Sequence, residues 1–149
     1  MSENKRAIYE NDEGVCCVII PSPRELREGG NLEEMFTKAA DGHHFEIIEA
    51  TDQPSDRYFR DAWKKNVNKI DIDMPKARNI HMDKLRIKRD EKLKTLDVEW
   101  QKETERGNSK NAQDVAYIKQ TLRDLPQTLD LSTVETPDEL RLILPEILI

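Results

Sequence analysis

The sequence predicts an α+β protein, with a small, mostly antiparallel sheet followed by a C-terminal antiparallel helical hairpin and a short capping helix. Two short apolar runs, VCCVII and HFEII, have the length of strands and are flanked by turn-rich segments. From residue 73 onward, the apolar residues recur at helical spacing instead. We therefore expect two domains, a small α+β domain at 1–73 and a helical domain at 74–149.

The first predicted element is a β-hairpin. Residues 5–10 and 15–21 form its strands, on either side of a turn-rich quartet at 11–14. The second strand is apolar on both faces and is therefore expected to be central in the sheet. Pro21 ends it, because proline has no N–H to donate to a neighbouring strand.

A short helix is expected next, over 32–40. Asn31 suits its N-cap, and Asp41-Gly42 ends it. Three further segments complete the front domain: a strand at 44–50, a helical turn or irregular knob at 56–63, and an extended stretch at 66–73. The aromatic side chains of the knob are expected to seal one end of the sheet: Tyr58, Phe59 and Trp63.

The second domain is expected to begin with a long helix from about Asp73 to about Arg106. Asp73 is a suitable N-cap, Pro75 suits the first turn, and Gly107 suits the left-handed residue after the last turn. The apolar residues of this helix follow helical spacing on one face: Leu85, Leu93, Leu96 and Trp100.

A second helix is predicted over 111–124, with Pro126 ending it. Its narrow apolar seam can lie antiparallel on the first helix and consists of Val115, Ile118, Leu122 and Leu125. A capping box at 136–139 predicts a short last helix over 137–143. The apolar tail that follows is expected to dock on another surface.

Charge is distributed unevenly along the chain. Residues 1–73 carry 10 Lys and Arg against 16 Asp and Glu, a net charge of −6, whereas residues 74–149 carry 14 of each. Lys84, Lys88 and Lys92 form a basic stripe on the first long helix. The acidic balance disfavours nucleic-acid binding, so we expect the stripe to face the acidic front domain, another acidic chain or solvent.

The residue patterns predict no catalytic, cofactor or metal site. No phosphate-binding glycine loop, nucleophile elbow or zinc-protease motif occurs in the sequence. Two polar pairs leave alternatives open: His43-His44 as weak metal ligands or a polar turn, and Asp71 with Asp73 as an acid pair or as a solvated residue and a helix cap. Adjacent Cys16 and Cys17 are expected to be unbridged thiols.

The chain is expected to be a soluble protein of a reducing cytoplasm. None of its apolar runs approaches the length of about 20 residues that spans a bilayer. Unbridged cysteines fit a reducing compartment. We therefore expect no membrane partner.

Two segments of the helical domain carry a resemblance to a known family. The run RIKRDEKLKTLD and the later run YIKQTLRDLP, followed by a TPDEL segment, resemble the tail-assembly chaperone-like proteins of tailed bacteriophages. The matching positions of the first run are Arg86, Arg89, Asp90, Leu93 and Asp97, and those of the second are Tyr117, Lys119, Gln120, Leu122, Arg123, Asp124, Leu125 and Pro126. In the front half, VIIPSP and SDRYFRDAW resemble small phage proteins encoded near tail-fibre genes.

The resemblance implies a non-enzymatic phage protein that assists tail or tail-fibre assembly through protein contacts. The alternative is a structural component, such as a tail or fibre adaptor, that remains in the virion tail. Its partner would be a phage tail or tail-fibre protein met in the host cytoplasm, and self-association is a further possibility. The residues expected to bind a partner are Leu85, Leu93, Trp100, Tyr117, Leu122, Arg123, Leu144, Ile147, Leu148 and Ile149.

Overall fold

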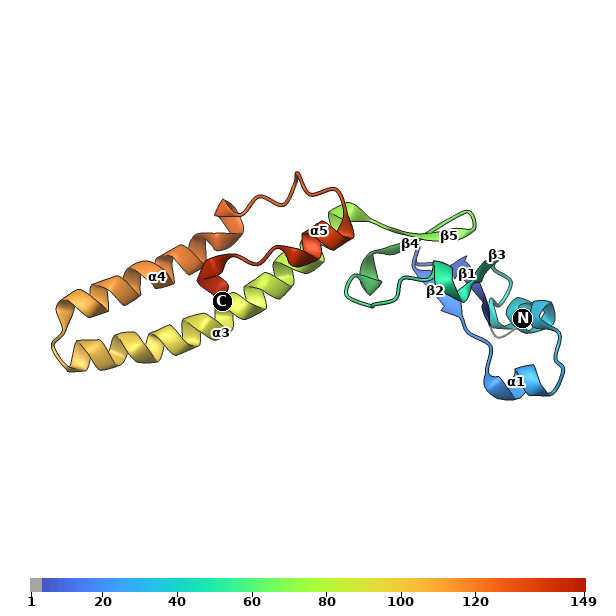
Figure 1. Ribbon diagram of the computed structural model, residues 1–149, viewed down its shortest axis with the longest axis horizontal. Helices are drawn as coiled ribbons and strands as arrows, with labels where there is room; N and C mark the ends of the chain where they lie inside the picture. Colours follow the sequence, from blue (N-terminus) through green and yellow to red (C-terminus); the bar gives the residue numbers. More distant parts are fainter. Residues whose placement is uncertain (1–3) are drawn as a thin grey trace. The chain divides into compact units, whose positions relative to one another are not determined.

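The computed structural model describes residues 4–149 and has the predicted α+β class, with small antiparallel sheets first and a helical hairpin and short helix after them (Figure 1). The chain divides into two compact units, one ending at Ala77 and the other running from Arg78 to Ile149. Residues 1–3 of the expected first domain lie outside the described range. No helix within 4–149 is long and apolar enough to cross a membrane.

The first unit is built on a three-stranded antiparallel sheet of order β2-β1-β3. These strands are β1 (Lys5–Glu10), β2 (Cys16–Ile19) and β3 (Phe45–Glu49). The expectation that the second strand is central was wrong, because β1 pairs with both neighbours and β2 lies at an edge. An apolar strand indicates that both of its faces are covered, but not that it has a neighbouring strand on each side. Other parts of the chain can cover the faces of an edge strand as well.

A two-stranded antiparallel hairpin follows, formed by β4 (Trp63–Asn66) and β5 (Lys69–Ile72). The predicted single extended stretch at 66–73 was therefore wrong, because the chain reverses at Val67 and Asn68. The predicted knob at 56–63 forms only one 3-10 turn, Arg60–Ala62, before Trp63 opens β4. Val67 takes a φ of 45°, a conformation that β-branched residues rarely adopt, so the turn is hidden from sequence patterns.

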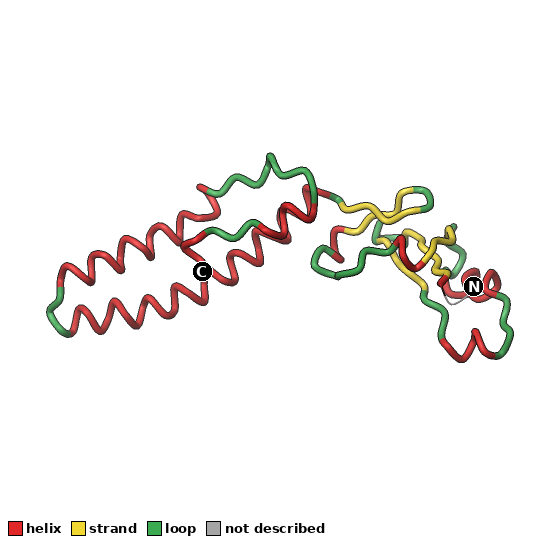
Figure 2. The backbone as a smooth tube through the Cα atoms, in the orientation of Figure 1, coloured by secondary structure: helices red, strands yellow, loops and turns green. Residues whose placement is uncertain are grey.

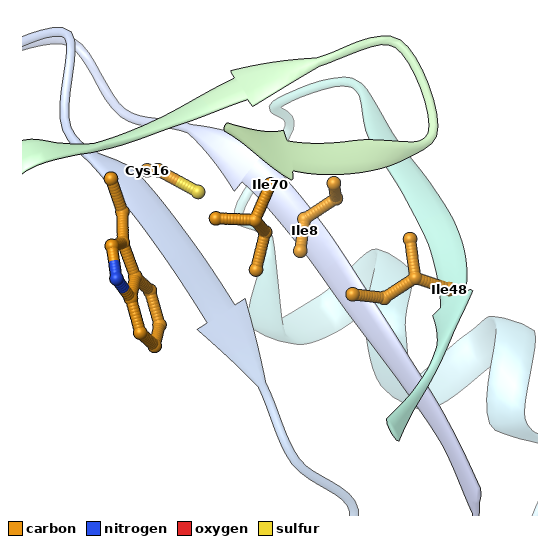
Figure 3. Packing of buried hydrophobic residues seen from close by; sticks show 5 residues of the cluster. Ile8, Cys16, Ile48 and Ile70 are labelled. Atoms are coloured by element: carbon orange, nitrogen blue, oxygen red, sulfur yellow. The ribbon is translucent and has the colours of Figure 1, made fainter. Parts of the chain in front are cut away.

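The core of the first unit lies between the sheet and this hairpin. Ile8, Cys16, Ile48 and Ile70 meet there, one from each of four strands, as Figure 3 shows. Trp63 joins the same cluster and is 5% exposed. Burying aliphatic side chains of this size contributes about 1.5–3 kcal/mol each, so the cluster fixes how the hairpin packs on the sheet.

Two short helices complete the first unit. α2 (Leu32–Ala39) begins at the expected N-cap, where Asn31 accepts hydrogen bonds from the N–H groups of Glu33 and Glu34. Its buried Phe36 meets Phe45 of β3 edge-on, with ring centroids 6.0 Å apart. α1 (Pro23–Arg27) was not expected, although Ser22 and Glu25 form its capping box.

The long helix α3 spans Met74–Glu105 and ends close to the positions expected from the sequence. Asp73 caps it by accepting a hydrogen bond from the N–H of Lys76. At its other end Gly107 has a φ of 72°, and the N–H of Asn108 donates to the carbonyl of Glu103. That pair of features is the Schellman motif, which turns the chain into the next helix.

The second helix of the hairpin, α4, spans Ser109–Thr128 and lies alongside α3 (Figures 1 and 2). The prediction that Pro126 ends it was wrong, because the proline lies inside its last turn. Proline removes one N–H donor, and the buried Leu125 keeps that turn in place by packing and by accepting from the N–H of Leu129. The chain then returns through α5 (Pro137–Leu142) and a 3-10 turn, Glu146–Leu148.

Candidate protein-contact site

Buried leucines hold the helical hairpin together. Leu85 and Leu96 on α3 and Leu122 and Leu125 on α4 are all less than 10% exposed. Two of the residues expected to bind a partner, Leu85 and Leu122, are therefore occupied by packing within the unit, and Leu93 is half-buried. The spacing of these leucines correctly predicts an apolar face on each helix, and packing within the helical unit buries that face.

Ionic and aromatic contacts tie the outer half of the hairpin. Lys119 Nζ lies 2.7 Å from a carboxylate oxygen of Asp97 and 5.4 Å from the centroid of the Trp100 ring. Asn111 also donates to the carboxylate of Glu103 at 3.3 Å. Asp97 and Lys119 belong to the two runs that carry the family resemblance, so these runs meet across the hairpin. Trp100 keeps 40% of its surface exposed.

Tyr117 presents an aromatic ring on the outer face of α4. It is 76% exposed, although Leu122 and Leu125 of the same run are buried. Gln120, one turn further on, donates to the carboxylate of Asp124 at 3.0 Å, and both side chains are exposed. Arg123 is exposed as well. The run thus divides into an inner apolar face and an outer face on which an exposed aromatic ring lies among polar groups.

The apolar tail docks in part on α3 of the same unit. The buried His81 shares a hydrogen bond with the carbonyl of Ile143 at 2.8 Å, and Lys92 Nζ donates to the carbonyl of Ile149 at 2.8 Å. Ile147 and Leu148 are half-buried, whereas Leu144 is 41% and Ile149 79% exposed. Lys92 of the basic stripe thus binds the tail by a hydrogen bond to a backbone carbonyl, a contact that the charge pattern does not predict.

The polar pairs of the first unit are engaged in local structure. His43 lies between two acceptors, the Ala40 carbonyl at 2.7 Å and the Asp12 carboxylate at 3.0 Å. The hydrogen bond to Ala40, and then that to Asp12, raise the pKa of His43. No group of three or more His, Cys, Asp or Glu side chains among residues 4–149 is arranged to hold a metal ion.

Asp71 and the cysteines also have local explanations. Asn66 donates to Asp71 at 2.6 Å, and this bond lowers the pKa of the Asp71 carboxyl group. Cys16 is a buried free thiol whose pKa is raised by burial, and Cys17 is a half-buried free thiol. A raised thiol pKa works against nucleophilic reactivity at neutral pH.

No family model matches this chain, and neither a search of curated proteins nor one of solved structures found a significant match. The contact surface must therefore be judged on its own geometry.

The sequence patterns missed four exposed apolar residues of the helical unit. Ile87 is 60%, Val98 53% and Leu142 81% exposed, and Ile118, which was expected in the buried seam of α4, is 38% exposed. Ile87 and Val98 fall outside the leucine stripe of α3, on the side of the helix away from Leu85 and Leu96. A helical projection of residues 74–105 would have identified Ile87 and Val98, because it places them on the face opposite the leucine stripe.

Proposed function

We propose that this chain is a non-enzymatic bacteriophage tail protein that assists tail or tail-fibre assembly by binding partner proteins. The observation that carries the proposal is the exposure of apolar side chains on the helical unit. Of the twelve large apolar side chains exposed within residues 4–149, eight belong to this unit: Ile87, Val98, Trp100, Tyr117, Ile118, Leu142, Leu144 and Ile149. Large apolar side chains that are exposed in the free chain can be buried against a partner protein.

The family resemblance supports the same proposal from another direction. Its second run places Leu122 and Leu125 in the hairpin core and Tyr117 outside. Because Tyr117 is 76% exposed, it contributes little to the packing of α4 on α3, and its place in the run favours recognition of a partner. Tyrosine is also among the residues that contribute most to protein interfaces.

The partner is best sought with a surface variant. A tagged chain expressed in phage-infected cells is expected to co-purify with a tail or tail-fibre protein, and Tyr117→Asp is expected to reduce the recovered partner at least tenfold. Ile20→Ser is a matched control, because Ile20 is also an exposed apolar residue (59%) but belongs to the first unit. If Tyr117→Asp and Ile20→Ser retain the partner equally, Tyr117 does not carry the contact.

Mass spectrometry of purified particles distinguishes an assembly factor from a structural component. An assembly factor is expected in infected-cell lysates and not in particles. A structural adaptor would instead be found in particles, at a copy number that matches the symmetry of the tail. Recovery of neither a tail protein nor a tail-fibre protein with the intact chain would contradict both forms of the proposal.

A further inference from the structure

A four-residue stripe of α3 faces solvent, on the side away from the hairpin seam. It consists of Ile87, Glu91, Lys94 and Val98, and all four side chains are exposed. The successive spacings of four, three and four residues are those of the contact positions in a coiled coil. The stripe therefore has the geometry of a helix-packing seam, and α4 lies on the other side of the helix.

The order of residue types in this stripe is its own complement. From the N-terminal end the stripe is apolar, acidic, basic, apolar, and from the opposite end it is apolar, basic, acidic, apolar. We propose that the stripe pairs with the same stripe of a second copy of this chain, in antiparallel orientation. Ile87 then meets Val98 of the second copy, and Glu91 meets its Lys94; the two-fold symmetry repeats both pairs.

The surface around Val98 has a shape that suits this arrangement. A shallow depression of about 570 Å³ lies there, lined by Lys94, Thr95, Val98, Glu99 and Lys102. In the antiparallel register the side chain opposite Val98 is Ile87 of the second copy. Paired helices pack in this way, with a side chain of one helix in a depression on the other.

Charge selects the antiparallel orientation over the parallel one. In a parallel pair with the same register, Glu91 would face Glu91 and Lys94 would face Lys94, so both layers would repel. In the antiparallel pair every charged layer is attractive. Two nearby acids on α3 are already paired within the chain, since Asp97 lies 2.7 Å from Lys119 and Asp90 lies 2.8 Å from Arg89. Arrangements of attraction and repulsion like this determine specificity more than affinity.

The pairing is expected to be weak, because each copy contributes only two apolar residues to it. Four apolar side chains and two pairs of partly exposed charges place the dissociation constant between about 10 µM and 1 mM. Association of this strength depends on local concentration. It therefore operates where several copies are held close together, and the inference stands independently of any role in tail assembly.

The test is a charge exchange measured by sedimentation equilibrium of the full chain at low salt. Wild-type protein is expected to form dimers as its concentration rises. The single variants Glu91→Lys and Lys94→Glu each replace the attractive layers by repulsive ones and are expected to weaken dimerisation at least tenfold. The double variant Glu91→Lys/Lys94→Glu restores the complementary order and is expected to dimerise like the wild type.

A mixture of the two single variants provides a second readout. Each alone is expected to dimerise at least tenfold more weakly than the wild type, but together they place lysines against glutamates and are expected to form a heterodimer. Asp114→Lys, a reversal of an exposed charge on α4, is the control for altered net charge and is expected to leave dimerisation unchanged. Circular dichroism of each variant verifies that the helices remain folded.

Three results would overturn the inference. The first is a wild-type chain that stays monomeric up to about 1 mM, the weakest affinity assigned above. The second is dimerisation of both single variants with the affinity of the wild type, which would place the interface elsewhere. The third is a double variant that fails to recover dimerisation although its circular dichroism matches the wild type.

Discussion

The two units of this chain differ in where they place their apolar side chains. In the unit that ends at Ala77, strands distant in sequence bring Ile8, Cys16 and Ile48 together with Ile70 in one buried cluster. In the helical unit, a seam of leucines holds two helices, and eight large apolar side chains remain exposed. A pair of helices has much more surface than interior, so many of its apolar side chains remain exposed. The sheet of the first unit is covered by the β4-β5 hairpin, and that unit leaves fewer of its apolar side chains exposed.

That difference suggests a division of labour within the chain. The first unit buries most of its large apolar residues at least in part, and within residues 4–77 four large ones are exposed: Val15, Ile20, Ile47 and Val67. The helical unit exposes twice as many in 72 residues. Substitutions of buried and of exposed residues, made in each of the two units, measure this difference.

The largest effect is expected from Leu122→Ala in the hairpin seam. Leu122 is fully buried, so truncation loses its burial and leaves a cavity, which costs about 3 kcal/mol of unfolding free energy. Because the two units have separate cores, hydrogen exchange is expected to accelerate in α3 and α4 and to remain slow in β1.

Two matched variants complete that experiment. Ile8→Ala is expected to give the reverse pattern, with faster exchange in the sheet, because Ile8 is fully buried in the first unit. Leu142→Ala is expected to change stability by less than about 0.5 kcal/mol, because Leu142 is 81% exposed. Equal acceleration of exchange in both units by Leu122→Ala would show that the chain unfolds as one body.

The helical unit was the more predictable of the two from sequence. The caps of α3 are local signals, because Asp73 and Gly107 each act within one turn of the helix. The order of the strands depends instead on pairings between distant residues. The sequence around β2 does not indicate that β1 is the central strand. The turn at Val67 lacks the glycine or asparagine–glycine pair that usually predicts a hairpin.

The contact surface was predictable only in part, for a related reason. Apolar spacing shows which residues share a face of a helix, but it does not show whether another segment covers that face. Leu122 and Tyr117 lie in the same run, and only the packing of α4 on α3 shows that one is buried and the other exposed. The tail is a similar case, since its docking on His81 and Lys92 depends on contacts across about 60 residues of sequence.

The next largest effect is expected at the turn between the two long helices. Gly107→Ala places a side chain at a φ of 72° and is expected to cost about 1–2 kcal/mol, because L residues with a Cβ are strained in that region. Urea denaturation monitored by helical circular dichroism measures the loss. Gly107→Asn is the control and is expected to lose less, because asparagine tolerates the left-handed conformation. Equal losses for the two variants would argue against backbone strain as the cause.

Val67 offers the opposite test in the first unit. It has a similar backbone conformation, with a φ of 45°, but carries a β-branched side chain that is 69% exposed. Val67→Asn is expected to raise the unfolding free energy by about 1 kcal/mol, since strain is relieved and little burial is lost. Val15→Asn, at an exposed apolar residue without a positive φ, is the control and is expected to give no gain. A destabilised Val67→Asn variant would indicate that the side chain of Val67 has a packing role.

The smallest effect concerns His43, which links the turn after β1 to the end of α2. Both ring nitrogens face acceptors, so the charged imidazolium satisfies both, and the pKa of His43 is raised first by the Ala40 carbonyl and then by Asp12. A raised pKa in the folded state means that this contribution to stability is complete below the ordinary value of about 6.5. It is lost as the pH rises through the higher folded value.

Asp12→Asn removes the carboxylate and is expected to lower the pKa of His43, as followed by the ring resonances in an NMR titration. The fall is expected to be partial, because the Ala40 carbonyl remains as the first cause of the shift. Glu13→Gln removes the adjacent exposed charge, and it is expected to leave the titration almost unchanged because solvent and salt screen that charge. If both variants shift the pKa equally, a diffuse acidic field rather than the Asp12 contact holds the proton. The first unit would then lack a specific ionic link at this turn, whereas Lys119 and Asp97 supply one in the helical hairpin.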